Sequence, residues 1–565
     1  MRKKIYIGIL LLGVLAIGGV SGLAYRGGQI KESVPQIETE QESIENENRE
    51  ELENTENVLV FSSDINMDIL SRHGLPGFER MKEEDQMTLV DSLQVIKKAE
   101  ALGIEKERFL YPELNLIETE EKCAKNKIDR SDCTKQVVYE GNSSVELQKL
   151  IEENPNTVIE IRSEYIEVTE SIYLKNHTYL IGNGVNLIGK GVKFIFLADS
   201  VEGIFLDSVQ ISGEAEYGIY IVNSKKIAVQ NSLIRGLEQK AVCIVGENQF
   251  IEIQNNIFQE NGAGGIWISG NTSYCLIEEN EVSGNYGTSN WMAGIVLTNI
   301  ELQDPMNIWQ TFDDAHHFPY KENLYTQTKC PYEIIVRGNK VLENNASGIY
   351  SDGAYLCYIV ENQVKENDKE GICLDYGTIG FYLKENIFDG NGERKRQTDE
   401  DLRMDFVLDA GKMENGSAKS KLPGVSLDNT AYNILENNVV INNFGGGIKM
   451  VRTTVRSLIM ENIIKDNNKG QNDVFHFFGV EVGAAVADVE STDMDFTPDY
   501  ENIICRNIIS GDHYSGVFIG EECYVNDVFD NVIMEPQMFA IEAISLQFNS
   551  IVNNISNSGV RNEYQ

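Results

Sequence analysis

Apolar and polar positions repeat along the chain from residue 231 onward with a period of about 24 residues. The marker of each repeat is an Asn that is followed, in nearly every case, by an apolar residue two positions later. Seven of the ten intervals between successive markers lie within one residue of 24, and the other three are longer because they contain inserted sequence. A repeat of this length predicts a solenoid in which each repeat forms one coil. The markers are Asn231, Asn256, Asn280, Asn339, Asn362, Asn386, Asn438, Asn462, Asn507, Asn531 and Asn554.

The positions around each marker predict short strands. An apolar residue stands three positions before every marker, and another stands two positions after every marker except Asn554. A second apolar run follows about nine residues later, as in the segments GGIWIS, SGIYSDG and EGICLDY. Alternation within these runs predicts that one set of side chains points into the core and that the residues between them point outward.

Three short strands in each coil predict an all-β fold, a right-handed parallel β-helix solenoid. The pattern begins near residue 144, where an amphipathic stretch precedes the first strands, and the β-helix is expected to span residues 144–565. Over this range the sequence resembles the pectate-lyase-like β-helix superfamily. The resemblance implies the fold and leaves the activity open. The marker Asn residues are expected to stack as an internal amide ladder that satisfies buried backbone groups.

The N-terminal part of the chain divides into three segments. Residues 1–27 contain twenty consecutive uncharged residues behind a basic start, which predicts a signal anchor that crosses the membrane, with a cleaved signal peptide as the alternative. Residues 28–57 are rich in Glu and Asn, which predicts an acidic disordered linker. Residues 58–143 predict a small mostly helical region, because apolar residues recur at helical spacing from Leu89 to Leu102.

The composition limits the choice of partners. The chain carries 48 Lys and Arg against 88 Asp and Glu, which gives a formal net charge of −40. A surface this acidic repels polyanions, so no nucleic-acid partner is expected. The nine Cys residues show no CxxC motif and no Cys/His spacing typical of zinc. Most are expected to be buried thiols, and only Cys123 and Cys133 are candidates for a local disulfide.

Three acidic residues occupy equivalent outward positions on successive coils. Asp352, Asp375 and Asp428 each stand four residues after the Gly that opens the second apolar run. Strand spacing places their backbones about 4.8 Å apart per coil. Carboxylates stacked in this way repel one another, so either a pKa rises or a cation binds. These three acids are therefore candidate metal ligands, and Ca²⁺ is the candidate cofactor.

Further charged residues follow on the same face. Lys449 and Arg452 stand on the next coil, and Glu481 stands on the coil after it. With the three acids they are candidate catalytic residues for two chemistries. In the first, two acids hydrolyse a glycosidic bond, with retention for neighbouring acids or inversion for acids two coils apart. In the second, Ca²⁺ on the acids binds a uronate carboxylate, and Lys449 or Arg452 removes the C5 proton in a lyase or epimerase reaction.

The resemblance implies the second chemistry, because β-helix lyases similar to this chain carry such an arrangement. The Asn-Thr-Asp, Asp-Asp, His-Gly and Arg-Ile-Lys motifs of polygalacturonase-like hydrolases are not intact in this sequence. The Arg-rich strand of pectate lyases is only loosely matched by residues 449–452. The structural alternative is a solvated row of Asp at strand ends, where Asp is a natural turn former.

Three insertions interrupt the repeat, at residues 299–335, 392–423 and 466–501, and are placed to wall a groove. Aromatic faces contact sugar rings, so aromatic and titratable residues at such places predict sugar binding. His476 and His513 lie beside the second apolar runs and are candidate general acids or bases, with a hydrogen-bonded structural role as the alternative. The candidate sugar-binding residues are Trp309, His316, His317 and Tyr376.

These features predict an extracellular, membrane-tethered enzyme, a lyase or a glycoside hydrolase, that processes polysaccharide in a groove of the β-helix. The alternative is a non-catalytic cell-surface module that binds glycan or serves as an envelope scaffold. The predicted partners are a polysaccharide and, through the N-terminal helix, the membrane. If the N-terminal segment is cleaved, the chain is secreted.

Overall fold

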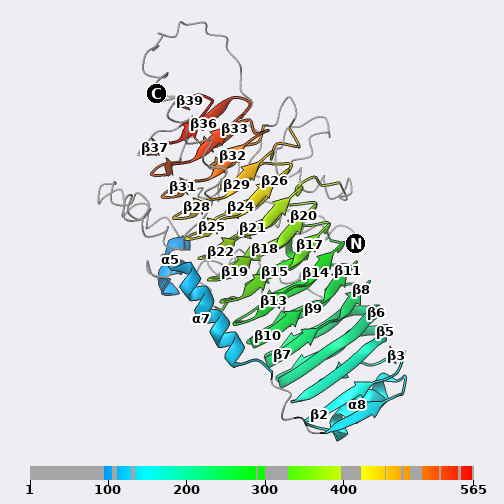
Figure 1. Cartoon of the computed structure of the whole chain (residues 1–565). Helices are drawn as coiled ribbons and strands as arrows, with labels where there is room; N and C mark the ends of the chain where they lie inside the picture. The colour runs from blue at the N-terminus through cyan, green and yellow to red at the C-terminus, as the bar shows by residue number, and fades with distance from the viewer. Residues whose placement is uncertain are drawn as a thin grey trace, which may run out of the picture. The chain divides into compact units, whose positions relative to one another are not determined.

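A solenoid of stacked coils forms the body of the protein (Figure 1). The computed structural model describes residues 94–104, 111–128, 133, 135–287, 290–299, 329–395, 421–451, 454–471, 476–483, 499–520, 523–544 and 549–562. Within these residues 39 strands join through parallel pairing, and the chain makes a right-handed β-solenoid of about 14 turns. The predicted parallel β-helix is therefore confirmed.

The first coils contain two unusually long strands. β5 and β6 each run through most of a turn and pair with one another over nearly their whole length. Shorter strands precede them, and β1 already pairs with β2, so strand pairing begins at Gln136, before the expected boundary at residue 144. These elements are β1 (Gln136–Tyr139), β2 (Thr157–Ile161), β3 (Tyr165–Val168), β4 (Ile172–Tyr173), β5 (Thr178–Asp199) and β6 (Glu202–Val222).

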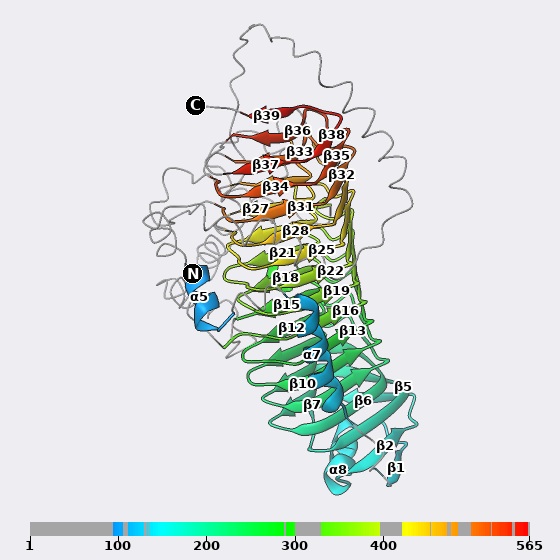
Figure 2. The same ribbon diagram turned by 60° about the vertical axis from the view of Figure 1, so that its left-hand side comes forward.

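From β7 onward each coil contributes one short strand to each of three sheets, visible as three columns of arrows in Figures 1 and 2. The first sheet consists of β7 (Lys225–Gln230), β10 (Gln249–Gln254), β13 (Leu276–Glu278), β16 (Ile335–Arg337), β19 (Tyr358–Val360), β22 (Tyr382–Lys384), β25 (Ile434–Glu436), β28 (Leu458–Met460), β31 (Ile503–Cys505), β34 (Asp527–Phe529) and β37 (Ser550–Val552). The second consists of β8 (Leu233–Arg235), β11 (Ile257–Gln259), β14 (Glu281–Ser283), β17 (Lys340–Leu342), β20 (Gln363–Lys365), β23 (Ile387–Asp389), β26 (Val439–Ile441), β29 (Ile463–Lys465), β32 (Ile508–Ser510), β35 (Val532–Met534) and β38 (Ile555–Ser556).

The third sheet carries most of the predicted site residues. Its strands are β9 (Val242–Val245), β12 (Ile266–Ser269), β15 (Ile295–Thr298), β18 (Ile349–Asp352), β21 (Ile372–Asp375), β24 (Val425–Asp428), β27 (Ile448–Val451), β30 (Val480–Val482), β33 (Ser515–Ile519), β36 (Phe539–Ala543) and β39 (Val560–Asn562). A short 3-10 helix, η4 (Asn290–Met292), precedes β15.

The core is a set of apolar columns, one inward position per strand. In the second sheet, for example, the inward residues of five successive coils are all fully buried. β-branched and aromatic side chains pack well on parallel sheets that are buried on their inner face, which is why these residue types recur at the period of the coil. The five residues are Phe258, Val282, Val341, Val364 and Phe388.

An internal amide ladder runs between the first and second sheets, as predicted from the marker residues. Oδ1 of a ladder Asn accepts the backbone N–H and the side-chain amide of the ladder Asn on the preceding coil; Asn280 accepts both from Asn256, each at 3.0 Å. The ladder Asn also donates to a buried carbonyl, as Asn256 does to Val229 at 3.0 Å. The ladder continues to Asn554.

The first marker is wrong by one residue. Ser232, not Asn231, donates its backbone N–H to Asn256 and so occupies the ladder position. Asn231 instead has φ of 52°, and the residue before each ladder position shares this left-handed conformation, with φ between 52° and 64°. Asn is one of the few residues that adopts such a conformation readily. An Asn at this turn position is therefore mistaken for the ladder Asn, which would stand one residue later.

A second amide ladder was not predicted. It lies five residues after the first, between the second and third sheets, and runs from Asn261 to Asn467 with the same geometry. Its last member is His513, whose Nε2 accepts the backbone N–H of Asn467 at 3.2 Å. The spacing N-x₄-N in most coils is the sequence signal for this ladder.

In the part of the chain that the structure describes, three α-helices accompany the strands. α8 (Ser144–Glu153) contacts the first strands and buries Leu147 and Ile151 in the core. α7 (Pro112–Lys125) lies against the outer side of the first sheet (Figure 2) and forms ion pairs with it, including Glu120 with Arg337. α5 (Gln94–Ala101) has the helical form that the spacing before Leu102 predicts. In the described residues, α5 and α7 therefore pack on the solenoid.

The expectations for residues 1–57, the anchor or signal peptide and the acidic linker, lie outside the described residues. Among the residues that the structure describes, no helix is long and apolar enough to span a bilayer. The suggested disulfide is wrong, because Cys123 and Cys133 are not bonded to each other. The thiol of Cys123 donates to the carbonyl of Tyr274, and that of Cys133 to the carbonyl of Asn156. Eight of the nine cysteines are buried, as expected.

Candidate functional site

The three predicted acids stand in register on the outer side of the third sheet. Asp352 pairs with Asp375 across β18 and β21, and the pairing of β21 with β24 brings Asp428 to the next step. Their neighbours Ile349 and Ile372 point into the core, so the acids point outward. We call Asp352, Asp375 and Asp428 the acid row.

The acid row is closed to solvent, contrary to the expectation of an open groove. The exposed fractions of Asp352, Asp375 and Asp428 are 0%, 1% and 6%. Carboxyl groups this deeply buried are stable only when the protein supplies hydrogen bonds or an opposite charge. The row therefore owes its stability to its immediate neighbours.

The first two acids have different neighbours. The indole N–H of Trp291 donates to Oδ2 of Asp352 at 2.9 Å, and the backbone N–H of Asn299 donates to its Oδ1 at 3.3 Å. Asp375 accepts the hydroxyl of Tyr350 at 3.2 Å and the backbone N–H of Tyr376 at 2.9 Å. Tyr376, a predicted sugar-binding residue, is half-buried and contributes this backbone contact.

A lysine from α5 lies beside the acid row. The Nζ atom of Lys98 donates to the carbonyls of Gly353 and Gly377, at 2.7 and 2.8 Å, and the side chain is buried. Burial raises the pKa of Asp352, and the charge of Lys98 opposes that rise; burial likewise lowers the pKa of Lys98 while Asp352 opposes the fall. Of the two alternatives that the sequence leaves open, a raised pKa or a bound cation, the structure shows a raised pKa of Asp352, with a lysine of this chain nearby.

No calcium site is shown. Among the described residues, no group of three or more His, Cys, Asp and Glu side chains is placed to hold a metal ion. The interpretation of Asp352, Asp375 and Asp428 as a set of Ca²⁺ ligands is therefore not supported, because each acid is hydrogen-bonded or packed within the protein rather than converging with the others on one point.

A second buried lysine, Lys240, lies just before β9 of the same sheet. Lys240 donates to the carbonyl of Trp291 at 2.6 Å and lies 5.0 Å from the ring centre of Trp267. Burial lowers its pKa to about 7. Since Trp291 also binds Asp352, Lys240 supports the residue that orients the first acid. The sequence analysis did not identify either Lys98 or Lys240.

Beyond the acid row the same face becomes partly exposed. Lys449 pairs with Ser426 on one side and with Glu481 on the other, and its Nζ lies 3.2 Å from Oε1 of Glu481. The two side chains are 20% and 13% exposed. The sequence correctly predicted that these two charges share the face of the acid row. Arg452 lies outside the described residues.

Stacked aromatic rings adjoin this ion pair on the side of Glu481. Phe518 pairs with Glu481 across β30 and β33, and its ring stacks on Phe478 at 4.5 Å and 19°. The ring of Tyr514 lies edge-on to Phe478 and stacks on His476 at 4.1 Å and 16°. His476 is exposed, and the other three rings are half-buried. We call this group the aromatic patch; it comprises Lys449, His476, Phe478, Glu481, Tyr514 and Phe518.

The two histidines considered as acids or bases have structural positions. His513 is 1% exposed and ends the second amide ladder, and burial lowers its pKa to about 4. A neutral ring that accepts a backbone N–H cannot reach a substrate, so its role as a general acid or base is not supported. His476 stacks on Tyr514. Trp309, His316 and His317 lie outside the described residues.

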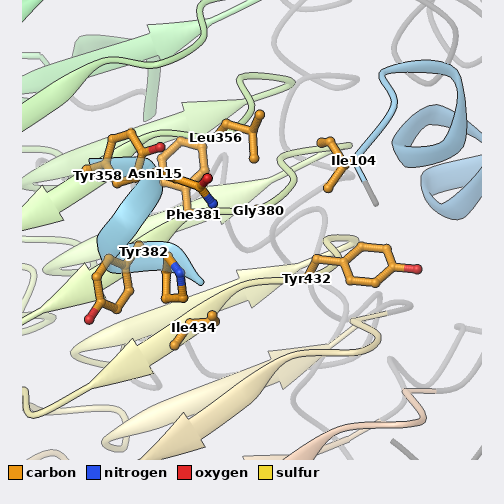
Figure 3. A pocket seen from close by; sticks show the side chains of 10 residues that line it. Ile104, Asn115, Leu356, Tyr358, Gly380, Phe381, Tyr382, Tyr432 and Ile434 are labelled. Atoms are coloured by element: carbon orange, nitrogen blue, oxygen red, sulfur yellow. The ribbon is translucent and has the colours of Figure 1, made fainter. Parts of the chain in front are cut away.

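A small pocket lies elsewhere, between the first sheet and the helical segments (Figure 3). Its lining is mostly apolar, and Tyr382 at its edge donates a hydrogen bond of 2.6 Å to Glu436. It contains none of the predicted site residues. The lining residues are Ile104, Pro112, Asn115, Leu356, Tyr358, Gly380, Phe381, Tyr382, Tyr432 and Ile434.

Two family models match the chain. One, described as a right-handed β-helix region, matches residues 116–299, and the other, described as the periplasmic copper-binding protein NosD, matches residues 320–474. No curated protein sequence matches. The described residues offer no cluster of ligands for copper.

Solved structures similar to the chain include enzymes and an adhesin. The A-module of a mannuronan C-5 epimerase from Azotobacter vinelandii shares 12% identity, covering 76% of this chain and 98% of the module, with a TM-score of 0.45. PfbA, a surface adhesin of Streptococcus pneumoniae, shares 12% identity, covering 74% of this chain and 91% of the adhesin chain, with a TM-score of 0.42. The catalytic domain of a GH87 α-1,3-glucanase in complex with nigerose shares 12% identity, covering 77% of this chain and 70% of that domain, with a TM-score of 0.38. Similarity at this level carries no argument about activity.

Proposed function

We propose that this right-handed parallel β-helix protein binds polysaccharide along the outer face of the third sheet, at the aromatic patch. The observation that carries this proposal is the stack of partly exposed rings that adjoins the Lys449–Glu481 ion pair through Phe518. Sugar rings bind to aromatic faces through their C–H groups, and a few placed charged groups hydrogen-bond their hydroxyls.

The arrangement of the patch suits a chain-like ligand. Lys449, Glu481 and Phe518 come from three successive coils of one sheet, β27, β30 and β33. A solenoid repeats its surface at each coil, so a polymer with a regular repeat can contact several coils in succession. The net charge of −40 opposes a polyanion, which favours a neutral glycan over a uronate-rich one.

The proposal places the protein outside the cytoplasm, held at the membrane by the basic and apolar residues at its N-terminus. That segment lies outside the described residues, and the tether remains a prediction. Membrane fractionation tests it: the full chain is expected in the membrane fraction, and a soluble mature form that begins near Tyr25 would show cleavage instead.

Glycan binding is tested with a panel of neutral and uronate oligosaccharides and the variant Phe518→Ala. Removing one ring of the stack is expected to weaken binding about fivefold, since an aromatic contact contributes about 1 kcal/mol. The matched control is Phe250→Ala, because Phe250 is also half-buried and stacked, on Tyr274 at 5.5 Å, but belongs to the first sheet. Equal weakening by both variants, or binding to no member of the panel, would refute the proposal.

A second candidate function is glycoside hydrolysis at the acid row. Asp352 and Asp375 are neighbours in register, and one strand step of about 4.8 Å is close to the carboxyl spacing of about 5 Å in retaining glycosidases. Burial raises the pKa of Asp352, as a general acid requires, and Asp375 would act as the nucleophile. This function requires that the buried acids become reachable. It predicts turnover that Asp375→Asn abolishes; absence of turnover in the parent on the same glycans leaves binding as the function.

A further inference from the structure

Two backbone carbonyls converge where the chain leaves β18 and β21. Gly353 follows Asp352 directly and Gly377 stands two residues after Asp375, and the carbonyls of both glycines accept hydrogen bonds from Nζ of Lys98. Because β18 and β21 are neighbours in register, the two carbonyls belong to equivalent turns of successive coils. Two carbonyls that converge on one point form a pair of acceptors that suits a primary ammonium group, and the buried Asp352 carboxyl acts on its charge through space.

The turns are built to present these carbonyls. Gly353 and Gly377 have φ of 74° and 72°, a region that favours glycine. At Gly353 a Cβ atom would also lie 2.7 Å from the side-chain nitrogen of Asn299. Both the conformation and the close approach require glycine at the first turn, so the direction of its carbonyl is fixed by the fold.

Lys98 joins α5 to the turns that follow β18 and β21. Next to it, Ala99 and Ile104 pack with Ile379 and Ala431 in a small apolar cluster that is separate from the core of the solenoid. The strands of the solenoid are held by their own ladders and core, so the fold of the coils does not depend on this cluster. The position of α5 depends instead on a buried charge and a few apolar contacts.

We propose that the carbonyls of Gly353 and Gly377 form a binding site for a primary ammonium group, which Lys98 occupies. Binding of an ammonium group at this site holds α5 in its position beside the acid row. The inference concerns the internal site and is independent of glycan binding.

Chemical rescue of Lys98→Ala in the full chain tests this site. Hydrogen exchange at the amides of α5 is expected to become at least about tenfold faster in the variant, because the helix loses its charged contact. Methylammonium chloride is expected to slow exchange again, whereas tetramethylammonium chloride at equal ionic strength is not, because it has no N–H to donate. The parent is expected to respond equally to both salts.

The matched control is Lys122→Ala in α7. Lys122 lies 3.6 Å from Glu333 and over the ring of Tyr274, and it is 44% exposed, so its removal leaves no enclosed site for a free ammonium ion. This variant is expected to show no difference between the two salts.

Equal effects of the two salts on Lys98→Ala, or no effect of either, would overturn the proposal. If Lys98→Ala is insoluble, the readout is the yield of soluble protein on refolding in each salt. A higher yield in methylammonium than in tetramethylammonium supports the site, and equal yields contradict it.

Discussion

The acid row and the aromatic patch lie on one face of one sheet, yet they differ in almost every physical property. Asp352, Asp375 and Asp428 are at most 6% exposed, whereas Lys449 and Glu481 are 20% and 13% exposed. The acids have partners from distant parts of the chain, such as Lys98. The charges of the patch neutralise each other across neighbouring strands.

The difference shows that the strand register alone does not predict a binding site. Both groups occupy outward positions of the coil, but the segments that pack over each position determine whether its side chain reaches solvent. Beside the acid row, Trp291 and α5 exclude water and supply the hydrogen bonds and the charge. At the patch the side chains remain partly exposed. An acidic row on the outside of a β-helix is therefore compatible with a purely structural role.

The largest expected effect is a difference in stability between a variant of Asp352, which lies near Lys98, and a variant of Glu481, which pairs with Lys449. Asp352→Asn keeps the shape of the side chain but leaves Lys98 buried beside a neutral amide, and we expect a loss of about 3 kcal/mol in the free energy of unfolding. Glu481→Gln makes the same change at the more exposed pair and is expected to cost about 1 kcal/mol or less. Urea denaturation of both variants measures the difference; equal losses would mean that the two regions are equally covered.

The second prediction uses pH, because the coils beneath the patch contain His513. The pKa of His513 is about 4 in the folded protein and about 6.5 in the unfolded chain, so between these pH values the unfolded chain binds a proton more readily than the folded protein. The contribution of neutral His513 to the free energy of unfolding is complete above pH 6.5. It falls by about 3 kcal/mol as the pH drops to 4. Hydrogen exchange should show β33 loosening before β21.

The control for this pH effect is His513→Asn, which keeps an acceptor for the backbone N–H of Asn467. Acidic residues titrate in the same pH range in both proteins, so the difference between the parent and this variant isolates the imidazole. A parent and a variant with the same pH dependence would contradict the role assigned to His513.

The smallest expected effect concerns the ion pair of the patch. Lys449→Gln is expected to lower stability by less than about 1 kcal/mol, because the pair is partly exposed. In 0.5 M NaCl the difference from the parent should shrink, since screening acts on charges that water can reach. A large loss that salt does not change would show that Lys449 is as enclosed as Lys98.

The sequence predicts the fold and the register well. The period of about 24 residues and the alternation around each marker lead directly to the coil, the first amide ladder and the shared face of Asp352, Asp375 and Asp428. These features are local or strictly periodic. The misplacement of one marker at Asn231 arises because Asn also suits the left-handed turn before the ladder position.

The surroundings of the site are less predictable, because they depend on distant contacts. Lys98 lies on an amphipathic helix, where a lysine is normally solvated, and its acceptor Gly353 is 255 residues away. The aromatic patch was also missed: Phe518 stands two residues after Gly516, in the register that Glu481 has after Gly479, but the stacking of its ring on Phe478 has no repeat that predicts it. Neither contact has a periodic signal.

We propose that the aromatic patch, and not the acid row, binds polysaccharide. The most direct test is the affinity of the parent, Phe518→Ala and Asp375→Asn for one neutral oligosaccharide that the parent binds, measured by isothermal titration calorimetry. If the aromatic patch binds the oligosaccharide, the affinity of Phe518→Ala is expected to be about fivefold weaker than that of the parent, and the affinity of Asp375→Asn is expected to be unchanged. Loss of binding in Asp375→Asn, with the affinity of Phe518→Ala equal to that of the parent, would instead place the oligosaccharide at the acid row.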